Sequence, residues 1–339
     1  MMDIGRISGV LENTGKVRVA VFGDFCLDKY LYSDPGRDEP SVETGLPAWQ
    51  IHAKRQFPGA GGTVTGNLRS LGAQVTCIGL MGDDGEGYEL RKALQAIGAD
   101  TEKMVQSEEL CTNTYTKPMR LRPEGGWEEA NRLDLRNFTS PSRALQQRLL
   151  ENLESCLHDV NAVILLDQFT QRNTGVLTDD VRQEVGRLAQ AHPEVIFYAD
   201  SRAFIREFRH VIIKCNNFEL MGPGVDSTDP EALGSRAREM QQTLGKPVFV
   251  TRGSQGMLVA ERGRVTAVPA FTVTGPVDIC GAGDASSAGI VLGLSLGLSA
   301  EEAALLGCCV SSITIEQIGV TGTATVQQVR NRLAGRSKE

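Results

Sequence analysis

The chain of 339 residues is long enough to bury a substantial hydrophobic core, and it carries a formal net charge of −7 at pH 7. This acidic balance argues against non-specific nucleic-acid binding, which depends on an excess of basic side chains. No apolar stretch approaches the length needed to cross a membrane, and residues 1–16 are too polar for a secretory signal. We therefore expect a cytoplasmic protein that binds neither nucleic acid nor membranes.

The eight cysteines and four histidines show no arrangement typical of a metal site or of a disulfide framework. No Cys-x-x-Cys pair occurs, and most of the cysteines lie in apolar runs. Buried, reduced thiols explain them best.

The first predicted strand covers residues 16–22, which are mostly apolar and β-branched. Asp24 and Asp28 follow it, at the end of the strand where open parallel sheets bind ligands. A carboxylate has two acceptor oxygens and can hold neighbouring hydroxyl groups of a ligand. Each aspartate could instead cap a turn, and this alternative is stronger for Asp24 than for Asp28.

Most of the remaining chain alternates between strand and helix patterns. The strands expected are residues 74–81, 162–166, 195–199, 211–214, 247–251, 257–260 and 264–269, and the helices are 88–97, 141–157, 176–191, 230–244, 285–298, 299–317 and 325–333. This alternation predicts an α/β fold with a doubly wound, mostly parallel sheet and helices on both faces. Three strands end in Asp167, Asp200 and Asn216, which we expect to meet at one edge of the sheet.

Three segments fall outside this alternation. Residues 32–55 are polar, contain three prolines and are long for a structureless loop. Residues 114–122 and 128–135 are predicted to form a hairpin that turns at residues 123–126. An acidic cluster at residues 83–86 precedes a helix, and a solvated helix start is a commoner explanation for it than a metal site.

Residues 58–67 are glycine-rich and are predicted to form a turn that leads into a helix. They match neither the Gly-x-x-x-x-Gly-Lys-Ser/Thr pattern of P-loop nucleotidases nor the Gly-x-Gly-x-x-Gly pattern of dinucleotide-binding folds. Neither pattern occurs elsewhere in the chain, so both classes of protein are disfavoured.

Two further motifs follow predicted strands. Asn216-Asn-Phe-Glu219 offers oxygen ligands that suit Mg²⁺, although it could also be a helix start with a capping acid. The Thr-Arg-Gly-Ser-Gln-Gly segment at residues 251–256 has glycines that would let the backbone approach a phosphate, but an ordinary hairpin turn is the alternative.

Residues 277–289 are the stretch with the clearest chemistry. Gly281 and Gly283 lie in a loop that opens an apolar helix, so its free N–H groups would form an anion site. Asp284 lies in the first helical turn, where it could act as a base toward a hydroxyl or could only cap the helix. A base beside an anion site is what phosphoryl transfer to an alcohol requires.

The Asp-Ile-Cys-Gly-Ala-Gly-Asp sequence at residues 278–284 resembles the Asp-x-x-Gly-Ala-Gly-Asp signature of the ribokinase-like PfkB carbohydrate kinases. The similarity extends from residue 17 to about residue 332. The resemblance implies a single ribokinase-like kinase domain over residues 1–339, with a small β lid formed by segments at about 29–56 and 111–136. It also implies an ATP-dependent sugar kinase that uses Mg²⁺. A lid would keep bulk water from competing with the acceptor hydroxyl.

The resemblance also implies roles for individual residues. Asp284 would be the catalytic base, with Gly281, Ala282 and Gly283 as the anion hole. The acceptor sugar would be bound by Asp24, Asp28, Gly59, Gly61, Thr63, Asn67 and Arg132. The nucleotide would be bound by Asn216, Glu219, Thr251, Gly253 and Gly256. Glu219 would hold Mg²⁺ through water, and the Asp278 region, with the loop at residues 319–325, would hold a monovalent cation such as K⁺.

Residues 23–30 and 131–134 are most similar to the branch of the family that phosphorylates D-glycero-D-manno-heptose 7-phosphate at C1. If the chain acts in that pathway, we expect a separate nucleotidyltransferase to act downstream. Ala60 and Thr63 depart from the family's usual Gly and sugar-contacting Asn, and residues 167–171 depart from the branch's Asp-Tyr-x-Lys-Gly. The cations considered for a distal phosphate are Arg37, Lys117, Arg120, Arg132 and Arg172, although solvated lid charge explains each equally well.

Other functions stay open. The acceptor could be a ketohexose, another sugar or a nucleoside. The fold could also serve as a non-catalytic sensor of a sugar or nucleotide, but Asp284 and the glycines beside it are intact. Exposed lid edges would also allow two copies to pair as a homodimer.

Overall fold

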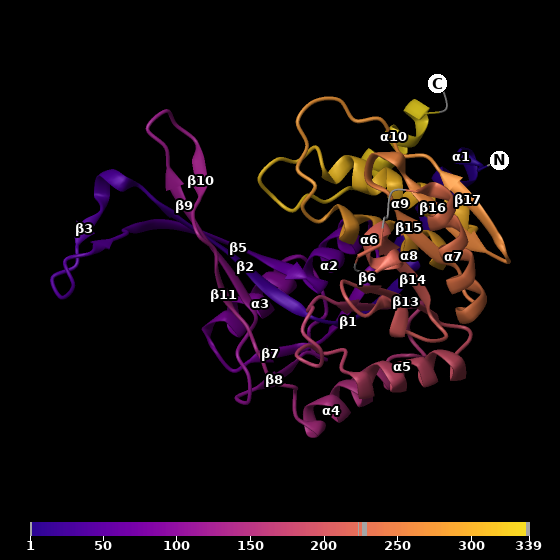
Figure 1. Cartoon of the computed structure of the whole chain (residues 1–339), viewed down its shortest axis with the longest axis horizontal. Coiled ribbons are helices and arrows are strands. Elements are labelled where there is room, and N and C mark those ends of the chain that lie inside the picture. Colours follow the sequence, from indigo (N-terminus) through magenta and orange to yellow (C-terminus); the bar gives the residue numbers. More distant parts are fainter. Residues whose placement is uncertain (1, 223, 226–228, 337–339) are drawn as a thin grey trace.

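An eight-stranded sheet lies at the centre of the computed structural model, which describes residues 2–222, 224–225 and 229–336 (Figure 1). In spatial order the strands are β17 (Arg264–Val268), β16 (Met257–Glu261), β15 (Val248–Thr251), β14 (Ile212–Asn216), β13 (Ile196–Ser201), β12 (Ala162–Asp167), β1 (Arg18–Gly23) and β6 (Gln74–Ile78). Neighbours from β6 to β15 are parallel, and β16 and β17 are antiparallel. The predicted mostly parallel sheet is confirmed.

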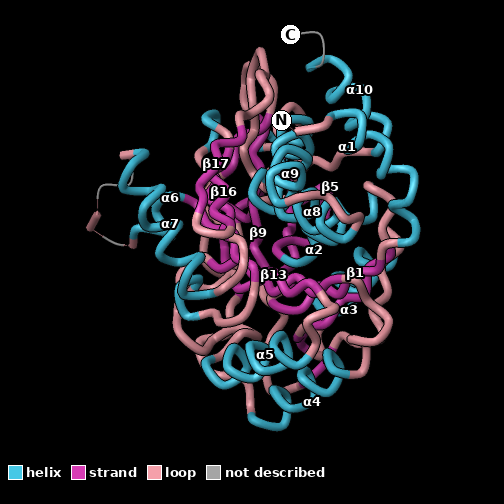
Figure 2. The backbone as a smooth tube through the Cα atoms, turned by 90° about the vertical axis from the view of Figure 1, so that its right-hand side faces the viewer, coloured by secondary structure: helices cyan, strands magenta, loops and turns pink. Residues whose placement is uncertain are grey.

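Helices cover both faces of this sheet because the strand side chains alternate between two apolar cores. Val19 and Val21 of β1 enter one core, and Ala20 and Phe22 enter the other. The helices of the first core are α1 (Ile4–Val10), α2 (Gly61–Ser70), α3 (Gly85–Ala96), α8 (Ala282–Ser295), α9 (Ala300–Thr314) and α10 (Val326–Arg336), and those of the second are α4 (Arg143–Glu154), α5 (Asp179–Ala191), α6 (Asn217–Met221) and α7 (Pro230–Leu244) (Figure 2). Within the described residues, no helix has both the length and the apolar character that a bilayer span requires.

A second sheet projects from this body on one side, and we call it the lid sheet (Figure 1). Its strands are β2 (Phe25–Ser33), β5 (Ile51–Ala60), β9 (Thr114–Leu121), β10 (Trp127–Glu129) and β11 (Leu133–Leu135), with β3 (Glu39–Pro40) and β4 (Pro47–Ala48) near its tip. β2 follows β1 after the single residue Asp24. The segments expected to form the lid lie in this sheet, and the predicted hairpin turns where expected, with the Arg122 amide bonded to the Gly126 carbonyl.

The sequence-based assignment was wrong at a few places. Residues 74–81 form two strands, because the chain bends at Gly79 and β7 (Leu80–Gly82) leaves the central sheet to pair with β8 (Val105–Ser107). A Cβ at Gly79 would lie 2.6 Å from the Gly23 carbonyl oxygen, so this bend requires glycine. Helix α1 and strand β8 were not predicted. The acidic cluster is a helix start: Asp84 caps α3 by accepting from the Gly87 amide.

Helices α8 and α9 pack so closely that glycines form their contact. A Cβ at Gly289 of α8 would lie 2.9 Å from the Gly307 Cα of α9 and 3.1 Å from a Val310 methyl carbon. Because α8 carries the stretch expected to be catalytic, this contact fixes where its first turn lies relative to the sheet.

We predict that Gly289→Ala lowers the free energy of unfolding by about 1–3 kcal/mol, because the added methyl group overpacks a rigid contact. Gly234→Ala in the middle of α7 is the matched control, since its Cβ would meet nothing closer than a Val265 methyl carbon at 3.9 Å. That variant should gain about 0.5–1 kcal/mol from helix propensity. Urea denaturation of both variants measures the difference, and equal effects would contradict the packing argument.

Candidate active site

The loop at residues 278–284 opens helix α8 as predicted, with Gly281 as its N-cap in the left-handed conformation (φ 76°). A Cβ at Gly281 would lie 2.6 Å from a Thr321 methyl carbon and 3.3 Å from that of Thr63, so only glycine fits there. The Ala282 amide already donates to the Ile279 carbonyl (3.1 Å) and is therefore not a free donor, which corrects its expected place in the anion hole. The Ala285 amide donates to the Gly281 carbonyl (2.9 Å), so the Gly283 and Asp284 amides of the first turn remain as candidate anion donors.

Asp284 lies in this first turn without serving as the cap. Its side chain accepts no hydrogen bond from any residue that the structure describes, whereas capping falls to Gly281. Burial, followed by the nearby Asp200 carboxylate, raises the pKa of Asp284 to about 7, and Lys214 and Arg202 oppose this rise. A carboxylate with a pKa near neutral pH suits a general base.

Asp28, on strand β2 of the lid sheet, faces the same region and adds to the rise in the pKa of Asp284. Its own pKa is raised by burial, against the opposing charges of Lys117 and Arg132. Gly59 on the neighbouring strand leaves the space for this carboxylate, because a Cβ there would lie 2.5 Å from Asp28 Oδ2. The structure thus brings the expected base, from helix α8, close to the expected sugar carboxylate, from strand β2 of the lid sheet.

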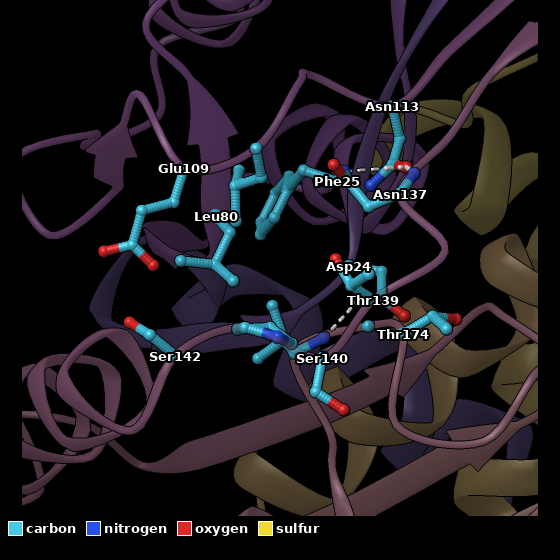
Figure 3. Close-up of a pocket in the computed structure, with 14 residues that line it drawn as sticks. Asp24, Phe25, Leu80, Glu109, Asn113, Asn137, Thr139, Ser140, Ser142 and Thr174 are labelled. Atoms are coloured by element: carbon cyan, nitrogen blue, oxygen red, sulfur yellow. Dashed lines mark hydrogen bonds between the residues drawn. The ribbon is translucent and has the colours of Figure 1, made fainter.

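Asp24 is buried, at 2% exposure, and both of its oxygens are occupied by the backbone. Oδ2 accepts from the Gln168 amide and Oδ1 from the Val176 amide, each at 2.8 Å. Burial raises the pKa of Asp24 to about 6, and these amides limit the rise. The cavity beside it, of about 30 Å³, has room for water and not for a sugar (Figure 3). Contrary to the expected sugar contact, Asp24 therefore braces the loops that follow β12.

In the glycine-rich segment at residues 58–67, too, some of the residues expected to bind the sugar are buried in structural contacts. Asn67, expected to contact the sugar, is fully buried within α2, where its Nδ2 donates to the Thr63 carbonyl (3.0 Å). Gly61 begins α2 against the main chain of Asp24, whose carbonyl oxygen would lie 2.9 Å from an added Cβ. Thr63 lies near the loop at residues 278–284, since its methyl carbon would lie 3.3 Å from a Cβ added at Gly281.

Asn216 and Glu219 form a reciprocal capping box at the start of α6. The Asn216 amide donates to Glu219 Oε2 (2.7 Å), and the Glu219 amide donates to Asn216 Oδ1 (2.8 Å). The alternative interpretation as a helix start with a capping acid is therefore correct, but it accounts for only one oxygen of Glu219. Glu219 Oε1 makes no hydrogen bond to a described residue, and burial raises the pKa of this carboxyl group.

A cavity of about 630 Å³ adjoins the first turn of α8. Its lining includes the expected residues Thr251, Gly253, Gly256 and Gly283. Residues that were not predicted from the sequence supply most of the apolar wall, and they are Met257, Phe271, Val277, Ile279, Cys308 and Ile315. Its size and apolar walls with a few polar groups are those of a small-molecule site.

Asp278 joins the loop at residues 278–284 to the loop after α9. Its Oδ1 accepts from the Cys280 amide (3.0 Å), and its Oδ2 accepts from the Gly319 amide (3.1 Å). Within the described residues, no group of three or more His, Cys, Asp or Glu side chains could hold a metal ion. A monovalent cation at Asp278 stays a prediction.

Most of the cations considered for a distal phosphate are paired elsewhere. Arg37, Arg120 and Arg172 form ion pairs with Asp34, with Asp38, and with Asp179 and Glu207. Lys117 donates to the Tyr30 hydroxyl (3.1 Å), and Arg132 stacks over Tyr115 while it binds Asp134. Of the five, Lys117 and Arg132 lie near Asp28.

Two cationic side chains near Asp28 and the first turn of α8 were not predicted from the sequence. Arg136 follows β11 and stacks over Phe169 at 4.7 Å, and its buried Nε and Nη2 have no hydrogen-bond partner in the described chain. Lys214 of β14 is 5% exposed and lies beneath Gly283, with Nζ 3.3 Å from the Gly283 carbonyl oxygen. A charged residue inside an otherwise apolar strand was the available signal for Lys214, whereas nothing in the sequence singled out Arg136.

Comparison with known proteins agrees with this geometry. Residues 18–326 match the model of the pfkB family carbohydrate kinases. Two relatives, both named bifunctional protein HldE, are 29% identical to the chain: that of Hyphomonas neptunium over 326 residues and that of Methylobacillus flagellatus over 308. These matches cover 95% and 89% of this chain but only 64% and 60% of the relatives, so the chain spans less than two thirds of their length.

Solved structures show the same fold at low sequence identity. Ribokinase of Arabidopsis thaliana, complexed with ribose and ATP, matches with a TM-score of 0.68 at 17% identity over 94% of this chain and 98% of its own. Phosphofructokinase-2 of Escherichia coli, in complex with potassium, matches with a TM-score of 0.72 at 16% identity over 95% and 99%. The fold is ribokinase-like, and the chain belongs to the PfkB family of carbohydrate kinases and is a sugar kinase.

Proposed function

We propose that this kinase transfers the γ-phosphoryl group of ATP to a hydroxyl group of a sugar or sugar phosphate, with Asp284 as the general base. The position of Asp284 carries the proposal. It directly follows Ala282 and Gly283, which line the cavity of about 630 Å³ that would hold the nucleotide, and its pKa is raised by Asp28, which would hold the acceptor. We place the reaction in the cytoplasm, as the eight free cysteines suggest.

In this mechanism Asp284 accepts the proton of the acceptor hydroxyl as its oxygen attacks the γ-phosphorus in line. Asp28 holds a hydroxyl group of the acceptor and so fixes the attacking oxygen near the base. The first-turn amides of α8 stabilise the negative charge on the transferring group. The lid sheet would keep water from the site, because water is a competing acceptor.

The nucleotide phosphates and Mg²⁺ would lie near the start of α6. Glu219 suits a magnesium ion held through water, because its Oε2 is used by the capping box and its Oε1 is free of protein partners within the described chain. When bound, Mg²⁺ would neutralise charge on the phosphates. Asn216, Thr251, Gly253 and Gly256 would contact the nucleotide from neighbouring turns.

For the acceptor we propose a phosphorylated sugar, with D-glycero-D-manno-heptose 7-phosphate as the first compound to test. Arg136 has two buried nitrogens that lack partners, and a phosphate would supply acceptors for them. It lies near Tyr115, whose pKa is raised by burial against the opposing charge of Arg136. Tyr115 is in turn paired in register with Asp28. Lys117 and Arg132 add positive charge on the same side.

The test is ATP-to-ADP turnover with Mg²⁺ against a panel of sugars, sugar phosphates and nucleosides, with products identified by mass. We predict turnover by the native protein, and a kcat lower by about two to four decades in Asp284→Asn because the general base is lost. Calorimetric ATP binding should be retained in that variant and serves as the control for folding. Normal turnover by Asp284→Asn would remove Asp284 as the base, and ATP binding without turnover of any acceptor would favour a sensor.

A second prediction concerns the phosphate of the acceptor. Arg136→Met should raise the KM for a sugar phosphate by about 10-fold or more, since a charge-assisted hydrogen bond is lost, and should leave the KM of neutral sugars unchanged. Arg122→Met is the matched control, because Arg122 is an exposed lid arginine whose partner is Glu128 at the hairpin turn. Equal KM values for Arg136→Met and the native protein would exclude this phosphate contact.

We also propose that two copies associate through the lid sheet, which exposes large apolar side chains. Leu133 of β11 is 63% exposed, and Leu135 of the same strand, Trp127 of β10 and Ile51 of β5 are also exposed. Sedimentation equilibrium should therefore detect a dimer, and Leu133→Glu should shift the equilibrium toward monomer. A monomer at all concentrations would refute this assembly.

A further inference from the structure

Lys214 is a lysine in the interior of the central sheet. It extends from β14, is 5% exposed, and makes two contacts through its ammonium group. Nζ lies 2.5 Å from Asp200 Oδ2 on the adjacent strand β13 and 3.3 Å from the Gly283 carbonyl oxygen in the first turn of α8. A buried ammonium group is costly unless it is paired, so this arrangement requires a compensating gain.

Asp200 extends the connection into α8. The Oδ2 atom that receives Lys214 also accepts a hydrogen bond from Ser287 Oγ (2.9 Å), and Ser287 in turn accepts from the Tyr198 hydroxyl (3.2 Å). Ser287 and Tyr198 are both fully buried. The pair therefore attaches α8 to two strands of the sheet through contacts at Gly283 and Ser287, on either side of Asp284.

We propose that the buried Lys214–Asp200 pair is a positioning element for phosphoryl transfer: it holds the first turn of α8 against the sheet and sets the charge around Asp284. This inference rests on the proposed role of Asp284 as the base. Neither Lys214 nor Asp200 needs to touch a substrate, since both act through the residue that does.

The two members of the pair act on Asp284 in opposite directions. After burial, Asp200 is the largest cause of the raised pKa of Asp284, whereas Lys214 lowers that pKa. The charged or titratable groups that interact with Asp284 from the surrounding elements are Asp200, Lys214, Arg202, Asp28, Cys280 and Tyr198. Because Asp200 and Lys214 carry opposite charges, their effects on the pKa of Asp284 partly cancel. Neutralising Asp200 should lower this pKa, and neutralising Lys214 should raise it.

The adjacent strand supplies a matched control. Asp167 at the end of β12 is also buried (4% exposed). It forms an ion pair with the buried Arg182 (3.3 Å) and accepts a hydrogen bond from Ser201 Oγ (2.7 Å). This second pair contacts α5 instead of α8 and is not among the largest causes of the raised pKa of Asp284. Its removal should affect stability without affecting the base.

The experiment is the pH dependence of kcat/KM for the acceptor at saturating ATP. In Asp200→Asn, loss of the negative charge should ease ionisation of Asp284, so the midpoint of the acidic limb should fall by about one pH unit. In the double variant Asp200→Asn/Lys214→Met, loss of the positive charge should move the midpoint back up. Asp167→Asn should leave the midpoint at its native value.

The outcomes separate this inference from the proposed function. Inactivity of Asp284→Asn with an unmoved midpoint in Asp200→Asn would overturn the positioning role and leave the base assignment intact. Activity of Asp284→Asn would overturn the base assignment itself. The midpoint does not depend on how much of the protein is folded, and Asp200→Ser is a second neutral variant if Asp200→Asn gives no folded protein.

Discussion

The interaction on which the site depends is the burial of the Asp284 carboxylate beside other carboxylates. Burial and Asp200 raise the pKa of Asp284 to about 7, which is high for an aspartate but suitable for a base at neutral pH. A site made only of carboxylates would remain protonated, so a positive charge must lie within reach. Lys214 supplies it from beneath the helix, with its Nζ 3.3 Å from the Gly283 carbonyl oxygen.

The parallel sheet makes this concentration of charge possible. Successive strands end at one edge, and Asp24, Asp167, Asp200 and Asn216 follow or close four of them. These groups have different roles. Asp24 and Asp167 are buried and satisfied by backbone amides and by Arg182, respectively, so they hold the loops, whereas Asp200 lies near Asp284. The lid sheet then brings Asp28 to the same place from outside the central sheet.

The sequence predicted what is local and missed what depends on distant neighbours. Strand and helix alternation, the lid hairpin and the loop that opens α8 are all set by residues close together in the chain, and the structure contains them. The burial of Asp24 is different, because its partner Val176 lies 152 residues away. Lys214 depends on Asp200 and Gly283 in the same way. No spacing rule indicates such partners.

The Asn216–Glu219 motif shows why a capping role and a functional role are not true alternatives. As a capping box it uses Glu219 Oε2 and Asn216 Oδ1, and so fixes both side chains at the end of β14. Within the described residues the second oxygen of Glu219 has no hydrogen-bond partner, and a carboxylate fixed in this way loses little conformational entropy when it orders a metal-bound water. The cap is therefore what would make Glu219 a good ligand. The same reasoning applies to Gly281, since the left-handed N-cap that begins α8 precedes the Gly283 and Asp284 amides, which we propose as anion donors.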